Sequence, residues 1–175
     1  YVHDVLKDMA KQTLLPRKVI IVEQNPLENS VSELDFLIIE SWPFKIKHLF
    51  NHQVGACNAR NLALQEVESE WVFLADDDIV FEANFLNSSF LFIKKYGVSA
   101  VSVSCLRENE TSSFNTVVQW QSFGSGCSIV ATTNLNKSTF GIGYEFGYGE
   151  DSDFGMQLRN QGVDVLYLPQ PRIVH

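Results

Sequence analysis

Three consecutive aspartates, Asp76, Asp77 and Asp78, directly follow the short apolar segment Trp71–Ala75. Crowded carboxylates repel one another, so a fold that gathers them usually binds a cation, and oxygen ligands favour a hard divalent ion. The apolar segment predicts a buried strand, and ligands of open α/β sheets bind at the carboxyl ends of strands. On an extended backbone Asp76 and Asp78 point to one side and Asp77 to the other. The alternative is an acidic turn that caps the next helix.

A second acidic pair, Glu150 and Asp151, lies between a segment rich in glycine and aromatic residues (141–149) and a predicted helix (151–161). A carboxylate at a helix N-terminus faces unpaired amide groups and the positive end of the helix dipole, so it stays ionised near neutral pH. Such a carboxylate can act as a general base. Taken alone, the pair could equally be a helix cap formed by Asp151, Ser152 or Asp153.

Helical and strand patterns alternate along the chain and would position these carboxylates. The predicted helices cover 2–9, 54–67, 85–96 and 151–161, and the predicted strands cover 18–23, 36–40, 71–75, 98–103, 126–132 and 163–168. Pro169 and Pro171 are expected to end the last strand. Repeated strand–helix–strand units indicate an α/β fold with a mostly parallel sheet flanked by helices. With 175 residues, the chain is expected to form a single domain, 1–175.

Composition excludes several classes of function. The net charge of −8 argues against a nucleic-acid partner, because phosphate backbones require a basic surface. No apolar stretch approaches the roughly 20 residues of a membrane span. The three cysteines have neither disulfide nor zinc-site spacing, so a reducing, cytoplasmic location is expected. Neither a dinucleotide-binding glycine loop nor a Gly-Lys-Ser/Thr motif is present, so any phosphate ligand would depend on the cation site.

The ordered combination of motifs resembles a family 2 glycosyltransferase. The resemblance rests on Gly-Ala-Cys-Asn-Ala-Arg-Asn (55–61), the segment ending in the three aspartates (71–78), Gly-Glu-Asp-Ser-Asp-Phe (149–154) and a final Pro-x-x-x-x-x-His. It covers nearly the whole chain, from Gln12 to His175. This family has the GT-A fold and transfers a sugar from a nucleotide diphosphate to a hydroxyl acceptor, with inversion and with Mn²⁺ or Mg²⁺ on the diphosphate.

The resemblance implies a role for each matching residue. Asp78 and His175 correspond to metal ligands, and Asp151 corresponds to the catalytic base. The remaining matches are to positions that contact the donor: Asp76 near the ribose and sugar, and Arg60 on the nucleotide. An exposed arginine in a surface ion pair is the alternative for Arg60.

Other parts of the donor site are expected from residue type. Gly126, in Gly-Ser-Gly (124–126), would let the backbone approach the donor sugar. Glu23 could accept a hydrogen bond from uracil, which favours a UDP-sugar donor. The aromatics of segment 141–149 could form a lid or stack on a sugar, or simply pack the loop down, and Trp120 could be an acceptor platform or core.

The sequence departs from the family at its start, because the chain begins in the helix that follows the family's first strand. Two unpaired strand edges are therefore expected beside the aspartate strand. The expected acceptor is a carbohydrate or a lipid-linked molecule used in surface polysaccharide or glycan assembly, in the cytoplasm or at the cytosolic face of a membrane. A sugar-1-phosphate nucleotidyltransferase and a non-catalytic nucleotide-binding domain are the alternatives.

Overall fold

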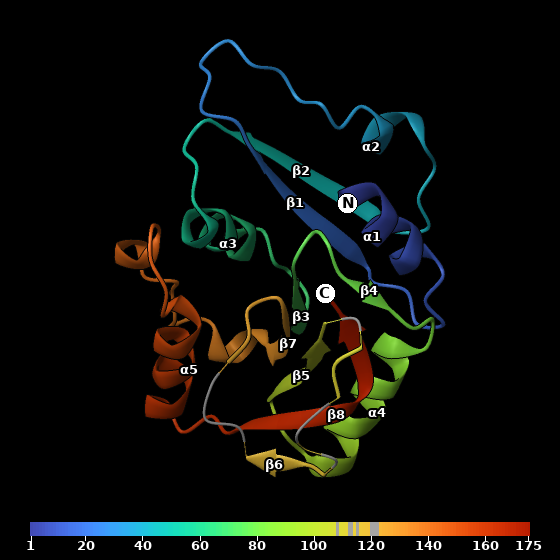
Figure 1. Ribbon diagram of the computed structural model, residues 1–175, viewed down its shortest axis with the longest axis vertical. Coiled ribbons are helices and arrows are strands. Elements are labelled where there is room, and N and C mark those ends of the chain that lie inside the picture. The colour runs from blue at the N-terminus through green and yellow to red at the C-terminus, as the bar shows by residue number, and fades with distance from the viewer. Residues whose placement is uncertain (108, 112–113, 115, 120–122) are drawn as a thin grey trace.

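The computed structural model describes residues 1–107, 109–111, 114, 116–119 and 123–175. In the view of Figure 1, a two-stranded sheet occupies the upper half of the molecule and a larger six-stranded sheet occupies the lower half, with helices packed around both. The helices are α1 (Val2–Ala10), α2 (Phe36–Ile39), α3 (Ala56–Gln65), α4 (Phe85–Tyr96) and α5 (Glu150–Asn160), with short 3₁₀ turns η1 (Thr132–Asn134) and η2 (Ile142–Tyr144). The strands are β1 (Lys18–Gln24), β2 (Lys45–Asn51), β3 (Trp71–Ala75), β4 (Val80–Phe81), β5 (Ala100–Leu106), β6 (Val118–Gln119), β7 (Cys127–Ala131) and β8 (Val165–Val174).

The four long helices begin and end close to their predicted positions. Helix α1 has a strongly amphipathic pattern and buries Leu6 and Met9. Helix α4 ends at Gly97, whose φ of 63° lies in the left-handed region that a non-glycine residue would resist. Helix α5 starts after Gly149, which also has a positive φ of 120°.

The partner of β1 in the two-stranded sheet is not the strand that we predicted at 36–40. Strand β1 pairs in parallel with β2, in continuous register from Lys18 opposite Lys45. The strand expected at 36–40 is instead the short helix α2, in which Leu37 is buried while Ile38 is 88% exposed. A short apolar run does not distinguish a strand from a helical turn. The strand that pairs with β1 is β2, which mixes polar and apolar residues and is partly buried.

The six-stranded sheet is mixed rather than mostly parallel. Its strand order is β3-β7-β5-β8-β4, and β6 pairs with β8. Among the described strands of this sheet, β5 and β8 form the one parallel pair. Strands β3 and β5 both pair antiparallel with β7, and β4 and β6 pair antiparallel with β8. The prediction of a mostly parallel sheet assumed that a helix connects each strand to the next. The connection from β5 to β7 contains no helix among its described residues.

The prolines near the C-terminus do not end β8, contrary to prediction. The pairing of β8 with β5 shifts register between Leu168, opposite Val103, and Arg172, opposite Ser104. Residues 169–171 therefore bulge out of the ladder, which accommodates both prolines, including the cis Gln170–Pro171 peptide. Beyond the bulge the strand continues to Val174.

The core consists of apolar residues packed between the sheets and helices. One cluster joins α1 and α4 to the end of β8, with Phe85 and Ile173 fully buried. A second cluster packs α5 against the six-stranded sheet, with Phe154 and Leu158 fully buried. Both clusters therefore fix the elements that carry the candidate functional residues. Trp120 lies outside the described residues.

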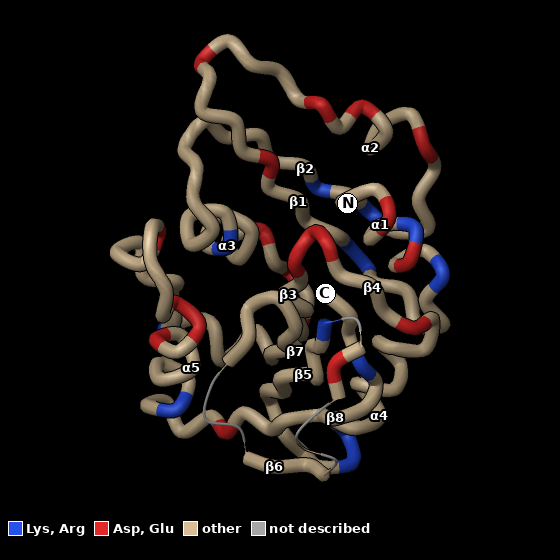
Figure 2. The backbone as a smooth tube through the Cα atoms, in the orientation of Figure 1, with Lys and Arg blue, Asp and Glu red and all other residues tan. Residues whose placement is uncertain are grey.

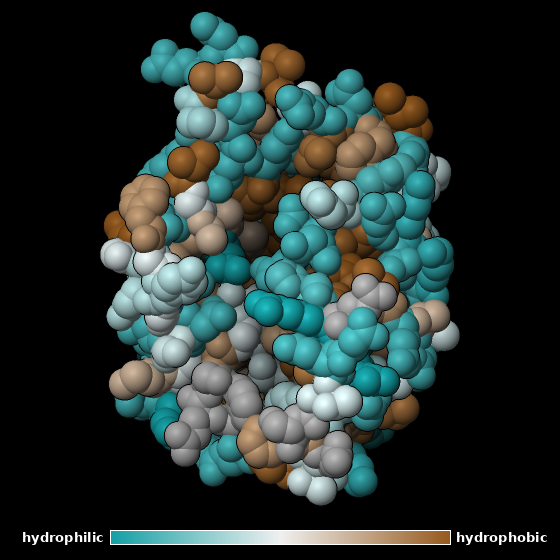
Figure 3. All heavy atoms as spheres, viewed as in Figure 1, coloured by the Kyte–Doolittle hydropathy of each residue, from teal (hydrophilic) through white to brown (hydrophobic). Residues whose placement is uncertain are grey.

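No backbone ladder among the described residues joins β1 to β3. Both are edge strands of separate sheets, as expected for the two unpaired edges beside the aspartate strand. Figure 3 shows a hollow at the centre of this face, with apolar atoms deep inside it. The two sheets are therefore connected through helices and side chains rather than through a continuous sheet.

Candidate active site

The three aspartates form a turn at the carboxyl end of β3, where Figure 2 shows an acidic loop near the C-terminus. Strand pairing ends at Ala75, so the triplet is not the extended segment that alternation assumed. Asp76 and Asp78 nevertheless each contact a basic side chain, whereas no hydrogen bond or ion pair among the described residues involves the exposed Asp77 side chain. Asp77 is not a helix cap, because Asn84 occupies the N-cap position of α4.

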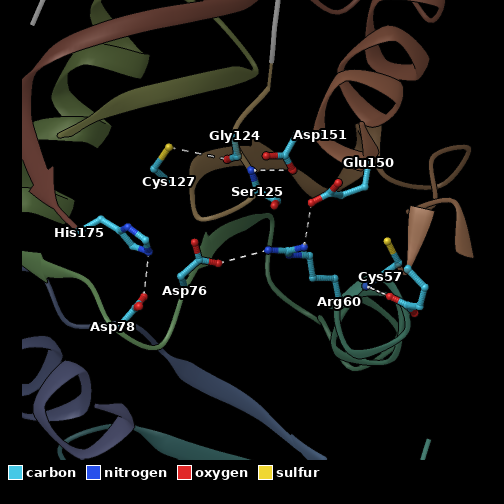
Figure 4. Close-up of polar contacts among 11 residues, drawn as sticks. Cys57, Arg60, Asp76, Asp78, Gly124, Ser125, Cys127, Glu150, Asp151 and His175 are labelled. Carbon is cyan, nitrogen blue, oxygen red and sulfur yellow. Dashed lines mark hydrogen bonds and ion pairs between the residues drawn. The ribbon is translucent and has the colours of Figure 1, made fainter. Parts of the chain in front are cut away.

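Asp78 lies beside His175, the residue that directly follows β8. The Asp78 Oδ1 atom is 3.1 Å from His175 Nε2, and both side chains are about half exposed. His175 is held here by its backbone N–H, which donates to the Leu106 carbonyl at 3.0 Å. The structure therefore brings together the two residues predicted as metal ligands (Figure 4).

Arg60, on α3, connects the two acidic groups of the site. Its Nη2 atom is 3.2 Å from Asp76 Oδ1, and its Nη1 atom is 3.9 Å from Glu150 Oε1. The guanidinium also lies 5.5 Å from the centre of the Phe140 ring. The Nη1 group is buried and has no hydrogen-bond partner among the described residues. Arg60 is thus not the exposed surface arginine of the alternative interpretation.

Gly126 provides space for Asp76. A Cβ atom on Gly126 would lie only 1.9 Å from Asp76 Oδ2, so the carboxylate rests directly on the backbone of this glycine. Gly126 was expected to let the backbone approach a donor sugar. The structure places Gly126 against the side chain of Asp76, which the family resemblance assigns to the donor site.

Asp151, in the first turn of α5, faces the turn that precedes β7. Its Oδ1 atom accepts a hydrogen bond from the Ser125 backbone N–H at 3.2 Å (Figure 4). Burial raises the pKa of Asp151 above its ordinary value, and the hydrogen bonds from Ser125 and the charge of Arg60 only partly offset this effect. We expected the helix terminus to favour ionisation, but burial dominates. A raised pKa makes Asp151 a stronger base than an exposed aspartate.

Glu145 is a site residue that the sequence analysis missed. It belongs to the 141–149 loop, and its Oε2 and Oε1 atoms accept hydrogen bonds from the backbone N–H groups of Cys57 and Asn58, both at 2.8 Å. These amides are in the first turn of α3. The only signal in the sequence was an acidic residue in an otherwise glycine- and aromatic-rich segment.

Glu23, near the end of β1, has partners within the protein. Its carboxylate accepts hydrogen bonds from the Ser32 hydroxyl at 2.6 Å and the Glu33 backbone N–H at 2.9 Å, and it lies 2.9 Å from His48 Nε2. Burial alone would raise the pKa of Glu23, but these contacts outweigh it and lower the pKa. In this structure Glu23 holds the loop after β1, and its contact with a nucleotide base remains a prediction.

Two cysteines lie close together at the end of β5 and the start of β7. A hydrogen bond from the Cys127 thiol lowers the pKa of the Cys105 thiol to about 7, and the same contact and burial raise the pKa of Cys127. Cys105 is exposed, while Cys127 and Cys57 are buried. All three are free thiols, as the sequence suggested.

The candidate metal ligands, Asp78 and His175, would complete only part of the coordination shell of a divalent cation. Asp78 and His175 offer one carboxylate and one imidazole, and no group of three or more His, Cys, Asp or Glu side chains forms a ready metal site in the described ranges. Mn²⁺ and Mg²⁺ are commonly held by one or two protein ligands together with phosphate oxygens and water. The pair therefore fits a cation that binds jointly with a diphosphate.

The family model for glycosyl transferase family 2 matches residues 1–152. The chain belongs to this family. The match covers the carboxylates at 76–78, Arg60 and Asp151. Among proteins with curated descriptions, none matches the chain in sequence.

Solved glycosyltransferase structures share the fold of this family 2 chain. TarS from S. aureus in complex with UDP superposes with a TM-score of 0.78 at 20% identity, covering 100% of this chain and 56% of TarS. The complex of TarS with UDP-GlcNAc gives a TM-score of 0.76 at 20% identity, covering 100% of this chain and 54% of TarS. GalNAc-T7 with UDP, GalNAc and Mn²⁺ gives 0.69 at 12% identity, covering 91% of this chain and 37% of GalNAc-T7.

These similarities confirm the α/β GT-A fold, with a mixed sheet flanked by helices. The family 2 chain spans about half the length of the TarS protein in its UDP complex. None of its described helices has the length and apolar character needed to cross a membrane.

Proposed function

We propose that this family 2 domain is an inverting glycosyltransferase that moves a sugar from a nucleotide-diphosphate sugar to a hydroxyl acceptor. The observation that carries the proposal is the convergence on Arg60 of a carboxylate from each acidic segment, Asp76 after β3 and Glu150 beside Asp151. The candidate donor-binding residue Asp76 and the segment of the candidate base therefore both lie beside the positively charged guanidinium of Arg60. Its Nη1 group makes no hydrogen bond among the described residues, only the 3.9 Å ion pair with Glu150, so it has donor capacity left for a phosphate oxygen of the donor.

Asp78 and His175 would hold the Mn²⁺ or Mg²⁺ ion. When bound, the cation would stabilise the negative charge of the departing nucleotide diphosphate. The protein carries a net charge of −8, so a diphosphate would meet an unfavourable field without a cation. The presence of Mn²⁺ with GalNAc-T7 supports the choice of a divalent ion.

Asp151 would act as the general base. As the acceptor oxygen forms its bond to the anomeric carbon, its proton passes to the Asp151 carboxylate, and the bond from the anomeric carbon to the diphosphate oxygen breaks with its electron pair on oxygen. The raised pKa of Asp151 suits proton acceptance near neutral pH. A direct displacement with a single base inverts the anomeric centre, whereas retention by double displacement would require a second carboxylate as nucleophile.

UDP is the favoured nucleotide, because TarS structures contain UDP and UDP-GlcNAc and GalNAc-T7 contains UDP. Glu23 would accept a uracil N–H at an acceptor site that its three present contacts leave open, because a carboxylate offers about four such sites. The acceptor is proposed to be a carbohydrate or a lipid-linked glycan intermediate of surface polysaccharide assembly. A location at the cytosolic face of a membrane would suit a lipid-linked acceptor.

Calorimetric titration with UDP and GDP, with and without Mn²⁺, tests this function. We expect UDP binding that depends on Mn²⁺ and is tighter than GDP binding. Preference for UTP over UDP would instead support a sugar-1-phosphate nucleotidyltransferase. No binding of any nucleotide would support a non-catalytic domain. Transfer would then be tested with UDP-GlcNAc, with release of UDP as the readout.

A further inference from the structure

The 141–149 loop is fastened to α3 at two points. At its N-terminal side, Asn61 on α3 forms two hydrogen bonds with the Phe140 backbone, from Nδ2 to the carbonyl at 2.8 Å and from the Phe140 N–H to Oδ1 at 2.9 Å. Further along, the Glu145 carboxylate binds the two first-turn amides of α3, both at 2.8 Å. A carboxylate at a helix N-terminus is also favoured by the helix dipole.

The start of α3 is shaped to receive the Glu145 side chain. A Cβ atom on Gly55 would lie 2.1 Å from the Glu145 carboxyl carbon, so only glycine leaves room for it. Gly55 also has a φ of 143°, and Gln24 at the end of β1 holds its backbone through hydrogen bonds of 3.0 and 3.1 Å. The Glu145 contact is therefore a built feature of the fold.

Little else holds the chain between Glu145 and the candidate base. Phe146 is 94% exposed and Tyr148 is 99% exposed, so neither ring fixes the loop by packing. Gly149 then leads directly into α5 and Asp151. The Glu145 carboxylate thus makes the last hydrogen bonds from the loop to α3, and the next contact with α3 is the longer ion pair of Glu150 with Arg60 at 3.9 Å.

From these contacts, and resting on the function proposed above, we propose that Glu145 is a positioning residue that sets the location of Asp151 relative to the donor site. It acts through the loop and does not touch the reacting atoms. Both of its oxygens are needed, because each accepts from a different amide. The variant Glu145→Gln would place an NH₂ group opposite an N–H donor, which breaks one of the two bonds while keeping the size of the side chain.

The test compares Glu145→Gln with Glu70→Gln, a control at an exposed glutamate whose side chain has no partner in the described part of the chain. For hydrolysis of UDP-GlcNAc with Mn²⁺, we expect kcat to fall about 10- to 100-fold, because small misplacements of a catalytic group are costly. The KM for the donor and the Kd for UDP should stay within about twofold. Hydrogen exchange should become faster in residues 141–153 of Glu145→Gln only.

Unchanged kcat and unchanged exchange would overturn the proposal. An equal loss of kcat and UDP affinity with a lower melting temperature would also overturn it, because Glu145 would then be a general structural residue. If the parent chain neither binds UDP nor hydrolyses the donor, the proposed function fails by itself. The exchange comparison requires no nucleotide and still decides whether Glu145 anchors the segment that carries Asp151.

Discussion

The Asp76 carboxylate rests on the backbone of Gly126, so that a Cβ atom there would lie 1.9 Å from Oδ2. Asp76 is also held by Arg60 at 3.2 Å, and it cannot move away from Gly126 without losing this contact. We therefore expect Gly126→Ala to weaken UDP binding and to cost about 1–3 kcal/mol of unfolding free energy through overpacking. Calorimetry and denaturant unfolding would measure the two effects.

Gly143→Ala is the matched control, because a Cβ at Gly143 would have no atom within 4 Å. Its effect on stability should stay within about 0.5 kcal/mol. Equal effects of the two substitutions would show that the contact between Gly126 and Asp76 is unimportant.

Neighbouring aspartates should differ sharply in metal dependence. Asp78→Ala should abolish the Mn²⁺-dependent part of UDP binding, because Asp78 and His175 are the proposed ligand pair. Asp77→Ala should leave UDP binding intact and change stability by no more than about 0.5 kcal/mol, because Asp77 is exposed and caps no helix. Titrations of UDP with and without Mn²⁺ would check both variants. Similar losses at the two positions would contradict the assignment.

Asp151→Asn should separate activity from stability. The amide can still accept the Ser125 hydrogen bond but cannot take a proton, so turnover should fall by about 10²–10⁴. UDP and Mn²⁺ binding should persist. Unchanged turnover would remove Asp151 from the mechanism.

The stability effect of Asp151→Asn should depend on pH. Because burial raises the pKa of Asp151, the folded state binds a proton more tightly than the unfolded state. Stability contributed by the protonated carboxyl is therefore present below the unfolded pKa and declines as pH rises through the folded pKa. Asp151→Asn removes this loss, so its melting temperature should exceed that of the parent at pH 7 and match it at pH 3, where the parent carboxyl is neutral as well. A lower melting temperature at pH 7 would contradict burial as the dominant effect.

Cys105 should be the most reactive of the three thiols. Its pKa is lowered to about 7, so its rate of alkylation by iodoacetamide should reach half its maximum near pH 7, measured by mass spectrometry. Cys127→Ser should move this midpoint, since it replaces the thiol whose hydrogen bond is the main cause of the shift. Faster labelling of the buried Cys57 would contradict this prediction.

Local patterns predicted the four long helices well, because residues at their ends signalled where they begin or stop, but α2 was predicted as a strand. Gly97 and Gly149 mark the end of α4 and the start of α5, and both have positive φ values. The turn at the end of β3 was given only as the alternative, because the alternation argument took Asp76–Asp78 as extended, whereas the strand ends at Ala75. The residues that matched family motifs lie around the end of β3, the N-terminal end of α5 and α3.

Long-range pairing was less predictable. The antiparallel insertion of β7 between β3 and β5 depends on contacts between segments distant in sequence, which periodicity does not reveal. Strand β2 was missed because Lys47 and His48 interrupt the alternation that begins at Lys45, whereas the neighbouring run Phe36–Ile39 is continuously apolar. Glu145 was missed for a similar reason: its partners are the amides of Cys57 and Asn58, far away in the chain.

Because of the bulge in β8, the number of residues between Leu168 and His175 determines whether His175 faces Asp78 in the proposed metal site. Side chains on a strand alternate between faces, so adding or removing one residue between Leu168 and Arg172 would either change the bulge or turn every later side chain to the opposite face. In the second case the imidazole of His175 would point away from Asp78. A change of a single residue here would separate the two candidate metal ligands without altering either of them.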